Sequence, residues 1–246
     1  MVIDEKDRKD DLFMVSDSKQ NGREQWKEQF NHIIHRDNLI YINLLLANFC
    51  MPTLLKLKPS SLIQITKIYS EWEEMKKQLS QRIEQYQCSF QVLYENQTMA
   101  SVLIFQKELM YSCVNCEDNY RFLLEQGYSL EGDKINSIFD MLKKKLYYYH
   151  HNRVGVEGIG SKEAELSSDR GSSPFEFPHE IGVILGYPIQ DVIGFVENKG
   201  QNYLISGWWK VYGNVEQTMR LFQQFKRLRA DSMQCISEGK KLPLKL

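Results

Sequence analysis

Residues 176–200 read EFPHEIGVILGYPIQDVIGFVENKG and contain two short helical patterns separated by a glycine and a proline. Pro178 stands where a first helix can begin, Gly186 where it can end, and Pro188 where a second can start. In the second pattern, apolar residues recur at helical spacing until Gly200 ends it. The stretch is compatible with a packed helical hairpin, a catalytic corner or a DNA-reading helix pair.

The segments on both sides of this stretch predict an α+β fold. Residues 60–65 are short and apolar enough for a strand, and residues 88–105 predict a hairpin that turns at Glu95-Asn96-Gln97-Thr98. Residues 201–213 predict an aromatic strand, after which Asn214 can cap a final helix. We expect a small mixed or antiparallel sheet of the split βαβ type, with helices packed on one face and a C-terminal unit of helical hairpin, strand and helix.

Composition divides the chain into three kinds of segment. Residues 1–36 are polar and irregular, which predicts a flexible N-terminal arm because they bury too little apolar surface to offset their ordering entropy. Residues 37–246 are then expected to form a single α+β domain. Within it, residues from about 152 to 173 are rich in Gly, Ser and charge, which predicts a flexible insertion.

The net charge and the apolar runs indicate which partners and which cellular compartment to expect. Thirty-one basic and 32 acidic residues nearly cancel, so no global field attracts nucleic acid or an anionic membrane. The N-terminus is charged from its fourth residue, unlike a signal peptide, and the longest apolar run, residues 39–51, is too short to span a membrane. We therefore expect a cytoplasmic protein without a membrane partner.

Five cysteines without a secretory signal favour reduced thiols. Cys113 and Cys116 form a CxxC, but no second CxxC or HxxxH supplies further zinc ligands, so chance spacing is the favoured interpretation. A redox role for Cys113 and Cys116 stays open, because a helical pattern follows the pair as it does in thioredoxin-like units. No metal site is expected.

Two longer motifs resemble a known family. The stretch from Glu176 to Asn214, EFPHEIGVILGYPIQDVIGFVENKGQNYLISGWWKVYGN, is similar to the signature of the Domain of Unknown Function 3793 family, found mainly in anaerobic Gram-positive bacteria. CMPTLLKLK at Cys50 to Lys58 resembles the Cys-x-Pro-Thr-Leu segment near the start of that family. The resemblance implies a bacterial protein, but it supplies no activity and no cofactor. This chain differs from the usual family pattern in the arm before Asn38 and in the insertion at residues 152–173. It also lacks the cysteines that family members often carry near the GWWKVY segment.

The resemblance also indicates where a site would lie. Seven of the residues that match the motif are the candidate functional residues: His179, Glu180, Tyr187, Asn198, Trp209, Lys210 and Tyr212. His179-Glu180 lacks the second histidine of a zinc HExxH, because position 183 is Val183. The pair could act as acid and base, although helix capping and packing explain it as well. Catalytic residues and cofactors therefore stay unassigned.

Three functions remain open, and we favour the first. A binding or accessory protein, without catalysis, would hold a small ligand or a protein partner near HEIG and GWWKVY. An enzyme would act on a small anionic metabolite with His179, Glu180 and Lys210. A helix-turn-helix regulator is disfavoured, because the second helix offers acidic Asp191 and Glu197 where DNA phosphates would lie.

Overall fold

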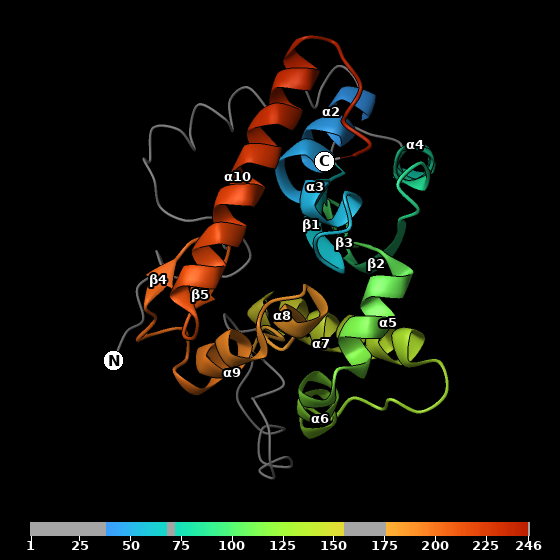
Figure 1. The fold of residues 1–246 in the computed structure, drawn as a ribbon. Helices are drawn as coiled ribbons and strands as arrows, with labels where there is room; N and C mark the ends of the chain where they lie inside the picture. The colour runs from blue at the N-terminus through green and yellow to red at the C-terminus, as the bar shows by residue number, and fades with distance from the viewer. Residues whose placement is uncertain (1–37, 68–71, 155–175, 246) are drawn as a thin grey trace.

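The computed structural model describes residues 38–67, 72–154 and 176–245, and it confirms the α+β class (Figure 1). The predicted arm, residues 1–36, and almost all of the predicted insertion, residues 152–173, lie outside these ranges. Both therefore stay predictions, as does the single-domain boundary.

The central sheet has three antiparallel strands in the order β1-β3-β2. These strands are β1 (Ser60–Thr66), β2 (Ser89–Glu95) and β3 (Met99–Phe105). Because β1 and β2 both run antiparallel to β3, they are parallel to one another, and helix α4 (Trp72–Glu84) connects them. This is the predicted split βαβ arrangement. Asn96 closes the β2–β3 hairpin by accepting hydrogen bonds from the backbone of Thr98 and Met99.

Helices cover both faces of this sheet, whereas the sequence analysis placed them on one. One face packs on α4 and on a helical segment composed of α2 (Asn38–Leu45), the π-helical turn η2 (Leu46–Cys50) and α3 (Met51–Leu54). The other packs on α5 (Lys107–Asn115), α6 (Glu117–Glu125), α7 (Lys134–Val154) and α8 (Ile181–Ile184). The reason lies in β3, where Val102 and Ile104 are buried on the first face and Leu103 and Phe105 on the second. A strand that is apolar on both sides needs cover on both.

The C-terminal unit comprises α9 (Ile189–Glu197), the short strands β4 (Ile205–Ser206) and β5 (Lys210–Val211), and the long helix α10 (Val215–Ser237). The single strand predicted for residues 201–213 is a small hairpin instead, closed by a hydrogen bond from Gly207 N to Trp209 O. Asn214 caps α10, accepting from Gln217 N at 3.0 Å. Figure 1 shows α10 extending from this hairpin along α2 and α3.

Candidate functional site

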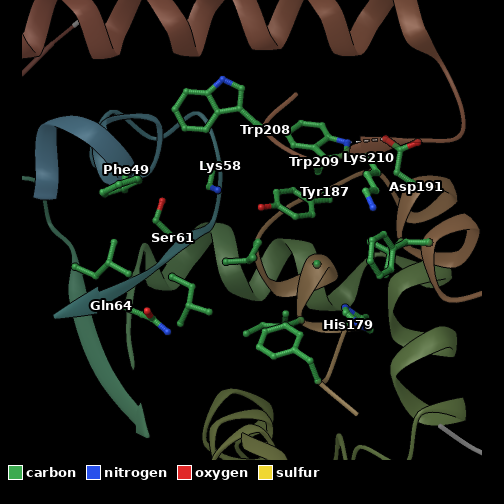
Figure 2. Close-up of a pocket in the computed structure, with 18 residues that line it drawn as sticks. Phe49, Lys58, Ser61, Gln64, His179, Tyr187, Asp191, Trp208, Trp209 and Lys210 are labelled. Atoms are coloured by element: carbon green, nitrogen blue, oxygen red, sulfur yellow. Dashed lines mark hydrogen bonds between the residues drawn. The ribbon is translucent and has the colours of Figure 1, made fainter. Parts of the chain in front are cut away.

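A pocket of about 130 Å³ lies where β1, the α8–α9 corner and the β4–β5 hairpin meet (Figure 2). Its aromatic lining consists of Phe49, Phe177, Tyr187, Phe195, Trp208 and Trp209. Its polar lining consists of Lys58, Ser61, Gln64, His179, Asp191 and Lys210. Ligand pockets commonly combine apolar walls with a few convergent polar groups, as here. The volume suits a small molecule, since a cavity of roughly 150 Å³ accommodates benzene.

The corner between α8 and α9 brings two distant segments together at this pocket. Gly186 ends α8 with a φ of +76°, a conformation in which side chains are disfavoured. A Cβ at Gly186 would also lie only 2.3 Å from Pro59 Cδ. The Ser60 hydroxyl donates to Ile184 O at 2.7 Å. Gly186 and Ser60 thus hold the start of β1 against the α8–α9 corner. Lys58 lies just before this strand and is positioned with it.

Asp191 fastens the β4–β5 hairpin to α9. Its Oδ2 accepts from Trp209 Nε1 at 2.7 Å, and its Oδ1 accepts from the backbone N–H groups of Tyr212 and Gly213, both at 2.8 Å. The side chain is buried. Although Asp191 contributes to the pocket wall, its carboxylate is occupied by three donors, so it is structural.

His179 lies in the pocket among aromatic rings. Its ring centroid is 4.5 Å from that of Phe195 and 5.3 Å from that of Phe177. Burial, and then the positive charge of Lys210, lower the pKa of His179 to about 4, so the imidazole is neutral at pH 7. Within the described ranges its ring nitrogens make no hydrogen bond, which leaves both available to a ligand.

Two lysines contribute positive charge to the same pocket. Lys210 Nζ donates to Gly200 O at 3.0 Å and lies 5.1 Å from the ring centroid of Tyr203. Lys58 Nζ lies 5.4 Å from the ring centroid of Tyr187. In the described part of the chain, neither ammonium group pairs with a carboxylate.

Burial sets the protonation of Lys58. Loss of hydration lowers the pKa of its ammonium to about 8. The face of Tyr187 stabilises the ammonium by about 0.5–2 kcal/mol, which compensates for part of that loss. Cys50 stays a neutral thiol, because burial raises its pKa far above the usual range.

Tyr187 and Trp209 form the aromatic wall that separates this pocket from the α10 core. Their rings stack with centroids 4.6 Å apart and an interplanar angle of 22°. Trp209 also meets Phe222 of α10 edge to face, at 4.6 Å. In Figure 2, Tyr187 lies between Lys58 and Lys210, and His179 lies below them.

Four of the seven predicted site residues therefore line the pocket: His179, Tyr187, Trp209 and Lys210. Glu180 lies elsewhere, although it follows His179 in the chain. Its buried carboxylate pairs with Lys145 and accepts from the hydroxyl of Tyr128 at 3.1 Å. The His-Glu pair is thus divided between the pocket and a structural ion pair.

Asn198 and Tyr212 also lie outside the pocket lining. Asn198 Nδ2 donates to Gly194 O at 2.8 Å and so closes the end of α9. Tyr212 packs on Gly194, where a Cβ would lie 2.5 Å from the tyrosine Cβ. Capping accounts for Asn198 and packing for the ring of Tyr212, whereas the buried Tyr212 hydroxyl has no hydrogen-bond partner among the described residues.

Seven further lining residues were not predicted from the sequence: Lys58, Ser61, Gln64, Phe49, Phe177, Phe195 and Trp208. Lys58 ends the CMPTLLKLK segment, so the second family motif was a usable signal for it. Phe49 belongs to the π-helical turn η2, a local irregularity that often occurs at functional sites.

The CxxC pair is separate from the pocket. Cys113 Sγ lies 3.2 Å from Val183 O as a hydrogen-bond donor, and burial raises the pKa of this thiol to about 11. Cys113 is thus held as an unreactive thiol at neutral pH. In the described ranges, no cluster of three or more His, Cys, Asp and Glu residues could hold a metal ion.

Fold and pocket together define an α+β protein with a small cationic, aromatic pocket beside a split βαβ sheet. The sequence profile described as "Protein of unknown function (DUF3793)" matches residues 46–244, and the chain belongs to this family. No curated protein and no solved structure matches it. None of the helices in the described ranges is long and apolar enough to cross a membrane, and the cytoplasmic location stays a prediction.

Proposed function

We propose that this chain is a binding protein whose pocket holds a small organic anion, with a carboxylate as the charged group. The observation that carries the proposal is the charge of the lining. Lys58 and Lys210 enter the pocket, while Asp191, the acidic residue of the lining, is already occupied by three donors. An anion at either lysine would supply the negatively charged partner that its ammonium group lacks among the described residues.

The walls indicate what the rest of the ligand is like. Tyr187, Phe195 and Trp209 offer flat apolar surfaces, and neutral His179 adds a ring that can donate or accept one hydrogen bond. A short aliphatic or single-ring body fits a volume of about 130 Å³. The small volume of the pocket favours a small ligand over a protein partner.

The helix-turn-helix alternative has little support in this geometry. The face of α9 that carries Asp191, Val192 and Gly194 is buried against the chain's own hairpin and pocket. Helix α8 has only four residues. We do not propose DNA binding.

Calorimetric titration with propionate and with benzoate, each compared with its neutral amide, tests the proposal. We expect at least one acid to bind about tenfold or more tightly than its amide, because a charge-assisted hydrogen bond in a desolvated site is stronger than a neutral one. Lys210→Met should remove this preference. Lys226→Met, which removes an exposed charge on α10, should keep it. Equal affinity for acids and amides would overturn the proposal.

A further inference from the structure

Strand β1 lies at an edge of the central sheet, because the order β1-β3-β2 gives it no second neighbouring strand in the described ranges. In an antiparallel pair, successive residues alternate between bonding to the neighbouring strand and directing their N–H and C=O groups away from it. Lys67 N donates to Thr98 O just beyond the strand, so the odd-numbered residues of β1 face β3. The residues that face away are Ser60, Leu62, Gln64 and Thr66.

The fold closes both ends of this outward edge and leaves its middle open. At the start, the Ser60 hydroxyl donates to the α8–α9 corner and holds it against the strand. At the end, Thr66 N donates to the hydroxyl of Tyr41 at 3.1 Å. Between them, the backbone N–H and C=O groups of Leu62 and Gln64 make no hydrogen bond to any described residue.

These open backbone groups belong to the pocket. Residues 61–64 of β1 all line it, although their side chains alternate between the two faces of the sheet. Leu62 packs with the core that contains Phe177, whereas Ile63 lies in the core against which Phe49 packs. Because both phenylalanines also line the pocket, the cavity extends around the edge of the strand from one face to the other. The unpaired backbone of β1 therefore forms part of its wall.

The partial charges along this open edge alternate in sign. Leu62 C=O presents an acceptor, and Gln64 N–H presents a donor beside it. A carboxylate offers acceptors alone and satisfies only the donor. An extended peptide of three residues offers both kinds of group at the spacing of a strand, and it satisfies Leu62 and Gln64 whether it runs parallel or antiparallel to β1.

We propose that this edge binds a short extended peptide, which joins the sheet as a further strand beside β1. The peptide would lie next to Ser61 and Gln64 in Figure 2. Two open residues and the one between them match about three ligand residues, since all strands rise about 3.3 Å per residue. The closed ends exclude a longer strand. The inference goes beyond the proposed function, because backbone pairing requires neither lysine of the pocket.

Titration of the isotope-labelled full chain with N-acetyl-trialanine amide, a neutral peptide, tests this inference. We expect the amide NMR signals of Leu62 and Gln64 to shift and their hydrogen exchange to slow, because their N–H groups gain acceptors. Methylation of every alanine nitrogen should weaken binding about tenfold or more, since the carbonyl groups of β1 then lose their donors.

A matched pair of variants tests the same contact from the side of the chain. Gln64→Pro removes the outward N–H without removing a bond to β3, and edge strands tolerate proline at such positions. Gln64→Ala removes the same side chain but keeps the N–H. We expect the proline variant to bind the peptide about tenfold or more weakly than the alanine variant, and equal binding would overturn the inference. The comparison of the two peptides decides the matter if Gln64→Pro fails to fold.

Other occupants of the edge would give different results. Exchange protection of Leu62 and Gln64 in the free chain at every concentration would mean that the chain itself covers the edge. Protection that increases with chain concentration would mean that a second copy does. Either result, or equal binding of the methylated peptide, would overturn the inference and leave the carboxylate site untouched. Peptide pairing without any preference for carboxylates over amides would support the inference and overturn the anion site alone.

Discussion

Charged side chains on the two sides of the α8–α9 corner are satisfied to different degrees. Away from the pocket, Glu180 pairs with Lys145 and accepts from Tyr128. At the hairpin, Asp191 accepts three hydrogen bonds. In the pocket, the one partner that Lys58 finds among the described residues is the ring of Tyr187.

This difference separates scaffold from site. A desolvated ionised group without a charged partner lowers stability, and such groups are concentrated at functional sites. The carboxylates of Glu180 and Asp191 find their hydrogen-bond and ion-pair partners within the fold, and these contacts stabilise it. The two lysines have no carboxylate partner in the described part of the chain, and they mark the place where a ligand is expected.

The largest effect should follow from removing Asp191. Asp191→Ala leaves the indole N–H of Trp209 and the backbone N–H groups of Tyr212 and Gly213 without acceptors. We expect a loss of about 3–4 kcal/mol in the free energy of unfolding, measured by urea denaturation. Asp191→Asn is the matched control, because its single amide oxygen can still accept from the backbone, and its loss should be smaller. A loss below about 1 kcal/mol for the alanine variant would show that Asp191 is not structural.

Glu180→Gln should have an intermediate effect. The neutral amide keeps the shape of the side chain but removes the charge that Lys145 faces, and we expect a loss of about 1–2 kcal/mol. The double variant Glu180→Gln, Lys145→Met should lose less than the sum of the single variants, as in any directly coupled pair. Strictly additive losses would contradict the pairing. Binding of carboxylates should be unchanged, since Glu180 lies outside the pocket lining.

Local chemistry made several features predictable from the sequence. The Asn96 turn, the Asn214 cap and the Gly186–Pro188 corner depend on neighbours in the chain, and all three are present. The cover on both faces of β3 was also encoded, because MASVLIF is a continuous apolar run rather than an alternating one. That signal favoured a strand buried on both sides.

The site itself depends on the tertiary structure. His179 and Glu180 are adjacent in sequence, yet they face different surroundings, which no spacing rule reveals. Lys58 reaches the pocket only because Ser60 and Pro59 contact the α8–α9 corner. A family motif can indicate such residues, but only the fold shows which of them share a cavity.

The smallest expected effect, and the one most specific to the pocket, concerns the stability of Lys58→Met. In the folded chain the pKa of Lys58 falls from 10.5 to about 8, so at pH 7 the unfolded chain holds the same proton more favourably. The charged amine therefore destabilises the fold at pH 7, and this effect weakens as the pH rises from 8 to 10.5. We expect Lys58→Met to raise the free energy of unfolding by about 1 kcal/mol at pH 7, because the Tyr187 ring compensates for part of the burial.

The gain should shrink at pH 9.5, where the folded chain already carries a neutral Lys58, and it should disappear above pH 10.5. Urea denaturation at the two pH values measures the change, with Lys226→Met on α10 as the exposed control that should alter stability at neither. A loss of stability at pH 7 would mean that the fold needs the Lys58 charge. Lys58 would then belong with Glu180 and Asp191 among the structural charges, and the distinction between scaffold and site would fail at its most important residue.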